Sequence, residues 1–168
     1  DEEKLADVRK KITDAGGFIK TYSCDITEYA ANDKLAKDVL KEFGQVDILI
    51  NNAGRSIRRS LALSYDRFHD FERTMQLNYF ACVRLTMNLL PSMTARKNGH
   101  VINVSSIGVL TNAPRFSAYV ASKAALESFA RCAAASPRRP IRSSTRSRAR
   151  RSSASCTTTS RSTSRRSD

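Results

Sequence analysis

The sequence has 168 residues, and its 29 Lys and Arg against 16 Asp and Glu give a formal net charge of +13. This length suits one domain, and 40% apolar residues suffice for a core only where no polar segment dilutes them. The sequence has no run of 18 apolar residues, and its four cysteines show neither metal-ligand spacing nor a disulfide framework. We therefore expect a soluble cytoplasmic protein with no membrane span and no metal site.

The first third of the chain predicts two helices with a strand between them. Apolar residues three and four positions apart indicate a helix over residues 1–15, which Gly16 and Gly17 end. A short strand is predicted at 18–24. Asp25 begins a turn into the second helix, where its carboxylate is well suited to cap the helix N-terminus. The apolar stripe of that helix ends before Gly44.

A nearly all-apolar segment at 46–50 predicts a strand that is buried on both faces of a parallel sheet. The small and amide residues 51–54 (NNAG) follow it, either as a simple turn or as a place where the backbone approaches a ligand closely. The asparagine amides there can also tie neighbouring strands together. The polar residues 55–64 should lie at the mouth of a site, where Arg55, Arg58 and Arg59 meet a phosphate or are simply solvated.

Residues 65–93 form a long helical pattern that Asn78 interrupts. An asparagine inside an otherwise apolar helix is costly unless its amide is hydrogen-bonded. We therefore expect Asn78 to have buried partners.

The stretch 99–126 (GHVINVSSIGVLTNAPRFSAYVASKAAL) predicts a buried strand, a loop and a helix that begins near Ser117. Tyr119 and Lys123 share one face of that helix, and Ser106 lies at the carboxyl end of the strand, where open α/β sheets bind their ligands. A nearby cation favours the phenolate form of a tyrosine, which makes the phenol a usable acid at neutral pH. A serine hydroxyl can hold the substrate oxygen against it. The trio is suited to proton donation to a carbonyl.

Several spaced motifs resemble the short-chain dehydrogenase/reductase family: NNAG at 51–54, LN at 77–78, NVSS at 103–106 and Y-x-A-S-K-A-A from Tyr119. The resemblance covers about residues 1–135. Within the family, the stretch from NNAG to LNYF looks most like actinobacterial reductase domains that act on fatty acyl-CoA or fatty aldehydes.

The resemblance implies an α/β fold with a Rossmann-like, doubly wound parallel sheet, of which this chain holds a part. It implies reduction of a small-molecule carbonyl (or oxidation of the alcohol) with NADP(H), NAD(H) being possible, and a homo-oligomer at full length. The catalytic residues it implies are Asn78, Ser106, Tyr119 and Lys123. The cofactor-binding residues it implies are Asp25, Ile26, Asn52, Ala53, Gly54, Tyr119 and Lys123. In this resemblance Asp25 bonds the adenine ring, and Asn78 holds a water that relays protons to Lys123.

Two family features have no counterpart in this sequence: the glycine-rich T-G-x3-G-x-G turn and a later Pro-Gly segment. That turn normally binds the pyrophosphate at a helix N-terminus. We therefore expect a partial domain over residues 1–135 that is inactive and binds neither cofactor tightly by itself.

Residues 136–168 carry ten Arg and one acid and lack hydrophobic periodicity, so we expect this tail to be disordered. Its composition is typical of an out-of-frame reading of a GC-rich coding sequence. The alternative function is a non-enzymatic module whose basic Arg/Ser tail contacts nucleic acid.

Overall fold

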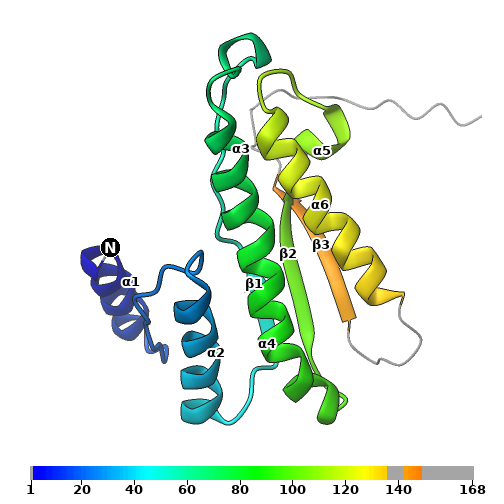
Figure 1. Cartoon of the computed structure of the whole chain (residues 1–168). Helices are drawn as coiled ribbons and strands as arrows, with labels where there is room; N and C mark the ends of the chain where they lie inside the picture. The colour runs from blue at the N-terminus through cyan, green and yellow to red at the C-terminus, as the bar shows by residue number, and fades with distance from the viewer. Residues whose placement is uncertain (1, 136–141, 149–168) are drawn as a thin grey trace, which may run out of the picture.

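A computed structural model describes residues 2–135 and 142–148 of the chain. Helices and three strands alternate along these residues (Figure 1). In chain order the elements are α1 (Glu2–Asp14), α2 (Tyr29–Phe43), β1 (Ile48–Asn51), η1 (Leu61–Leu63), α3 (Phe68–Met75), η2 (Gln76–Phe80), α4 (Ala81–Ala95), β2 (His100–Ser106), α5 (Gly108–Thr111), α6 (Ser117–Ala134) and β3 (Arg142–Arg148).

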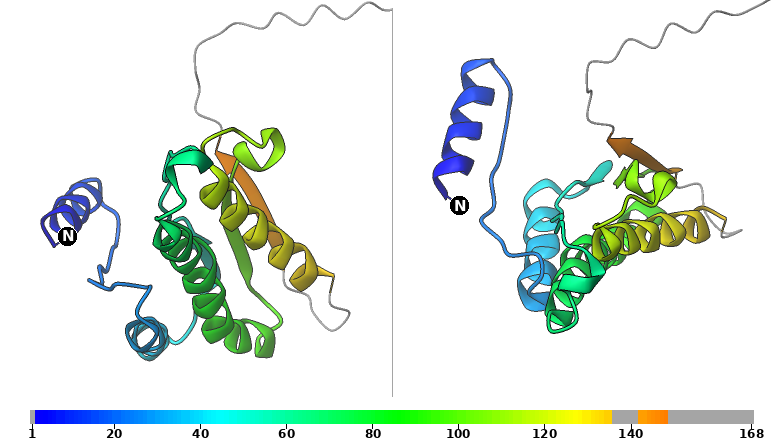
Figure 2. Two further views of the ribbon diagram at one scale, coloured as in Figure 1. Left: turned by 45° about the horizontal axis from the view of Figure 1, so that its top comes forward. Right: turned by 90° about the horizontal axis from the view of Figure 1, so that it is seen from above.

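The three strands form one parallel sheet in the order β1-β2-β3. In the β1–β2 pair, Ile48 lies opposite His100. Helices α4 and α6 cover one face of the sheet (Figure 2). The prediction that β1 is buried on both faces was wrong, because no described element covers its other face, where Ile48 and Ile50 are each 58% exposed.

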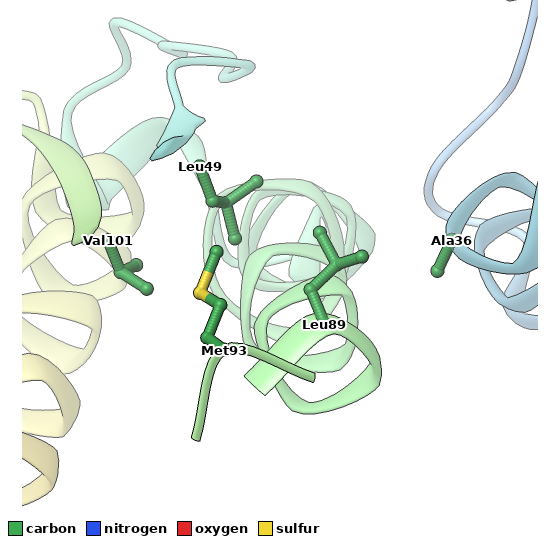
Figure 3. Close-up of a cluster of buried hydrophobic side chains, with 5 residues drawn as sticks. All are labelled: Ala36, Leu49, Leu89, Met93 and Val101. Carbon is green, nitrogen blue, oxygen red and sulfur yellow. The ribbon is translucent and has the colours of Figure 1, made fainter. Parts of the chain in front are cut away.

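The core lies between the sheet and the helices and is built by the alternation of the strands. Inward residues of β1 and β2 meet α4, and α4 in turn packs against α2 (Figure 3). Gly99 lets the chain enter β2 tightly beneath this cluster, because a Cβ there would lie 2.6 Å from the Cβ of Met93. The buried members are Ala36, Leu49, Leu89, Met93 and Val101.

The N-terminal region follows its helix predictions and departs from its strand prediction. Helix α1 is present, and α2 ends at Gly44, whose φ of 74° suits glycine and whose N–H donates to Leu40 O. Residues 18–24 form no strand, and Phe18 is 83% exposed. A strand needs a neighbouring strand for its backbone groups, and β1 already pairs with β2 while no described strand flanks it on the other side. Helix α1 buries none of its side chains and stands apart from the sheet (Figure 2).

Residues 142–148, which belong to the segment 136–168, form β3 along β2. The open edge of β2 presents backbone N–H and C=O groups, and a neighbouring segment satisfies these whatever its side-chain periodicity. Residues 136–141 and 149–168 lie outside the described residues. Within the described part, no helix is long and apolar enough to cross a membrane.

Candidate active site

A cleft of about 190 Å³ opens beside the carboxyl ends of β1 and β2. Its walls come from the segment that follows β1, from the last residues of β2 and from the start of α6. It brings together four of the predicted catalytic and cofactor-binding residues: Asn52, Gly54, Tyr119 and Lys123. The remaining lining residues are Arg55, Ser56, Val104 and Ser105.

Lys123 lies at the inner end of this cleft and is 3% exposed. Its Nζ donates to Val104 O at 2.8 Å, which holds the ammonium against the end of β2. Burial lowers the pKa of Lys123 below its ordinary value, and the nearby Cys82 opposes this weakly. Tyr119, one helical turn earlier, is partly exposed to the cleft, so a phenol and a buried amine share one small space.

Asn78 lies in η2, a single π-helical turn between α3 and α4, where the sequence predicted one long interrupted helix. Its side chain is fully buried and fully bonded. Oδ1 accepts from the Arg55 N–H at 2.8 Å, while Nδ2 donates to Arg55 O and to Ser122 Oγ, both at 2.9 Å. The expected partners are thus present, and the amide joins the segment after β1 to helix α6. Such π turns are frequent at functional sites.

Gly54 packs directly on both Asn78 and Lys123. A Cβ at Gly54 would lie 3.2 Å from Asn78 Oδ1 and 3.3 Å from Lys123 Nζ. The absence of a side chain therefore keeps the cleft open above the lysine.

Ser106 is not among the residues that line the cleft. Its Oγ accepts the N–H of Gly108 at 3.1 Å and so shapes the turn into α5. The neighbouring Ser105 lines the cleft instead and is 4% exposed, and its Oγ has no hydrogen-bond partner among the described residues. Sequence reasoning missed Ser105, although strand alternation could have found it, because it shares a face with the buried Asn103.

The tie between strands that the NNAG segment suggested is confirmed at Asn51. Its Nδ2 donates to Asn103 Oδ1 at 2.8 Å and to Thr86 Oγ1 at 3.1 Å, and all three residues are buried. This network fixes the ends of β1 and β2 against α4, and therefore fixes the two strand ends that border the cleft.

Asp25, Ile26 and Ala53 do not line the cleft. Asp25 is exposed, and its Oδ1 accepts from the N–H and the hydroxyl of Thr27, which lowers the pKa of this carboxyl. The helix-capping alternative for Asp25 was wrong, because the residue before α2 is Glu28 and no side chain caps that helix. Ile26 O accepts from Asn32 Nδ2 at 3.0 Å.

Among residues 2–135 and 142–148, no three His, Cys, Asp or Glu side chains are grouped so as to hold a metal ion. The described residues form a parallel α/β sheet of the Rossmann-like class with a tyrosine and a buried lysine at its carboxyl edge. Residues 1–142 match the family model described as short chain dehydrogenase, and the chain belongs to this family.

Relatives in this family agree with the resemblance inferred from the motifs. The chain is 59% identical over 134 residues to a fatty acyl-CoA reductase of Acinetobacter baylyi, which covers 80% of this chain and 45% of that protein. It is 52% identical over 131 residues to a fatty acyl-CoA reductase of Mycobacterium tuberculosis, and this match covers 77% of this chain and 45% of that protein. The chain thus spans less than half the length of these relatives.

Solved structures support the fold. A metagenomic short-chain oxidoreductase in complex with NADP superposes with a TM-score of 0.80 at 32% identity, covering 86% of this chain and 66% of that chain. An NAD+-bound xylitol dehydrogenase superposes with a TM-score of 0.75 at 28% identity, and this match covers 87% of this chain and 55% of that chain.

Proposed function

We propose that this chain carries the acid–base site of an NAD(P)(H)-dependent oxidoreductase that reduces a carbonyl. The observation that carries the proposal is the cleft shared by Tyr119 and the buried Lys123 beside the open backbone of Gly54. NADP(H) is our first choice of cofactor because a structural neighbour is described with NADP, and NAD(H) is the alternative because another is described with NAD+.

The residues present fit a nicotinamide cofactor. A side chain at Gly54 would close the space above Lys123, and the orphaned hydroxyl of Ser105 offers a buried polar contact to a bound group. Asn52, Gly54, Tyr119 and Lys123 would hold the cofactor at the cleft, with Asp25, Ile26 and Ala53 as outer contacts. The cofactor supplies the hydride.

The protein groups then manage the substrate oxygen and its proton. Tyr119 donates a proton to the carbonyl oxygen, and the Lys123 ammonium favours the phenolate that remains. Ser106 is proposed to hold the substrate oxygen: its Oγ accepts from the Gly108 N–H, which leaves its hydroxyl proton to donate to that oxygen. Asn78 positions the Arg55 backbone and helix α6, and its backbone is the proposed anchor of the relay water.

The substrate class that we propose is a fatty acyl thioester or a long-chain aldehyde. Two relatives bear the name fatty acyl-CoA reductase. Exposed apolar side chains follow the cleft-lining segment on the outer surface, and they suit an alkyl chain. They are Leu61, Leu63 and Phe68.

The test is NADPH oxidation with a long-chain acyl-CoA or aldehyde, measured on the protein extended to the length of its relatives. Tyr119→Phe should lower kcat by about 10² to 10⁴ with unchanged thermal unfolding, because it deletes one proton donor. Tyr65→Phe is the matched control, since Tyr65 is 84% exposed. Equal loss in both variants, or no loss at Tyr119, would refute the assignment.

The alternative function, a nucleic-acid module built on the basic tail, rests on residues 136–168. Most of these lie outside the described residues, and no observation within the described part favours it.

A further inference from the structure

A second cleft, of about 240 Å³, lies beside the first and is lined mainly by arginine. Arg58, Arg59, Ser60 and Leu63 come from the segment that follows β1, and Arg115 comes from the loop before α6. Three guanidinium groups among five lining residues make this cleft suited to an anion.

The backbone holds these arginines together. The Arg59 N–H donates to Arg115 O at 2.7 Å and so fastens the two segments to each other. Arg115 has a φ of 68°, in the left-handed region that residues with a side chain rarely adopt. Such strained positions persist only where the surrounding structure enforces them, and they cluster at ligand sites.

Positive charge remains available in this cleft after the internal ion pairs are counted. Asp70 is 3% exposed and bonds Arg67 and Arg73, and its Oδ2 lies 3.3 Å from Arg59 Nε. The Arg59 Nε–H is nevertheless buried without a hydrogen bond, because the contact with Asp70 lacks hydrogen-bond geometry. Arg58 and Arg115 form no side-chain hydrogen bond or ion pair with another described residue.

The two clefts are walled by the same two stretches of chain. Arg55 and Ser56 line the first cleft and Arg58 lines the second, and three residues span at most about 10 Å. On the other wall, Arg115 lies in the loop just before α6, and Tyr119 lies in the first turn of that helix. A ligand with a reactive group at Tyr119 and a flexible arm therefore reaches the arginines with its far end.

We propose that Arg58, Arg59 and Arg115 bind the phosphate groups of the carrier of an acyl thioester whose carbonyl lies at Tyr119. The inference rests on the proposed function, since it assigns the phosphate end of that substrate. The planar guanidinium groups match phosphate oxygens bidentately. Leu63, which is 66% exposed, offers an apolar contact to the arm.

The test measures binding of coenzyme A to the 168-residue chain by calorimetry. Arg58→Ala and Arg115→Ala should each weaken coenzyme A binding at least tenfold, because each removes a charge-assisted contact. Raising the salt concentration should also weaken coenzyme A binding by the unmodified chain. Arg131→Ala, an exposed arginine late in α6, is the matched control and should change nothing. Pantetheine, which lacks the phosphates, should bind all four proteins alike.

Equal coenzyme A affinity in all variants that retain their circular dichroism would overturn the inference. Should Arg115→Ala fail to fold, Arg58→Ala and the charge-preserving Arg58→Lys decide between the outcomes. A single-stranded oligonucleotide that binds as tightly as coenzyme A, with the same dependence on Arg58, would also overturn it in favour of nucleic acid.

The readout separates this inference from the proposed function, because coenzyme A binds without reacting. Arginine-dependent binding of coenzyme A, together with no NADPH oxidation by the protein extended to the length of its relatives, would support the phosphate site and refute the reductase. An active reductase whose KM for acyl-CoA is unchanged by Arg58→Ala would leave the function and refute the phosphate site.

Discussion

Removing the Asn78 amide tests how the cleft is held together. The side chain makes three hydrogen bonds, two to the backbone of Arg55 and one to Ser122. At a net contribution of about 1 kcal/mol each, Asn78→Ala should lower the free energy of unfolding by about 3 kcal/mol. Urea unfolding followed by circular dichroism measures this as a shift in midpoint at constant slope.

Amide hydrogen exchange localises the effect. The Arg55 N–H donates to Asn78 Oδ1, so it should be protected in the unmodified chain and lose protection in Asn78→Ala. Asn98→Ala is the matched control, because Asn98 is exposed and should shift stability by less than about 0.5 kcal/mol. A loss of stability under about 1 kcal/mol, or an Arg55 amide that remains protected, would refute the conclusion that the Asn78 hydrogen bonds hold this segment in place.

Asn78→Asp separates the acceptor from the donor. One carboxylate oxygen still accepts from the Arg55 N–H, but the other must face the Arg55 carbonyl, which repels it. The pKa of this buried carboxyl should therefore rise above its unfolded value. Stability is then highest at pH values below the unfolded pKa and falls as the pH rises through the folded pKa. A variant as stable at pH 7 as at pH 4, relative to the unmodified chain, would contradict the geometry.

Two further predictions concern the floor of the cleft. Burial lowers the pKa of Lys123, so the unfolded chain binds more protons between that folded pKa and the ordinary value of about 10.5. In urea unfolding, the stability of the unmodified chain relative to Lys123→Met should therefore rise with pH across this window, and a pH-independent difference would mean that the lysine is not shifted. Gly54→Ala should leave the unfolding midpoint nearly unchanged yet lower NADPH oxidation by the protein extended to the length of its relatives more than tenfold, because its methyl group crowds Asn78 and Lys123. Gly99→Ala should instead lower the midpoint, since its Cβ meets Met93 in the core, and retained activity in Gly54→Ala would count against the site.

The parts of the fold that the sequence predicted correctly depend on local patterns. The existence of β1 and β2 follows from two apolar segments that end in polar residues. The shared cleft of Tyr119 and Lys123 follows from helical spacing alone. The spacing of Tyr119 and Lys123 is set within one helix, whereas β1 and β2 each supply the backbone partner that the other needs.

The failures have the opposite origin. Residues 18–24 have the composition of a strand, but a strand exists only where a neighbour satisfies its backbone groups. Conversely, Arg142–Arg148 has no apolar pattern and still forms β3, because the open edge of β2 accepts it. Side-chain patterns predict which residues can be buried, whereas the edges of the sheet decide which segments become strands.

In the candidate site, too, the sequence predicts which residue needs hydrogen-bond partners but not where those partners lie. Sequence alone indicated that Asn78 needs partners, but those partners lie 23 and 44 residues away. Its amide spans both backbone groups of Arg55 and the hydroxyl of Ser122, whose Oγ in turn donates to Tyr119 O at 2.7 Å. One buried asparagine therefore connects the segment bearing the arginine cleft to the backbone of the proposed acid. A change in that segment should alter the position of Tyr119, so the two ends of the proposed acyl thioester substrate would be coupled through Asn78.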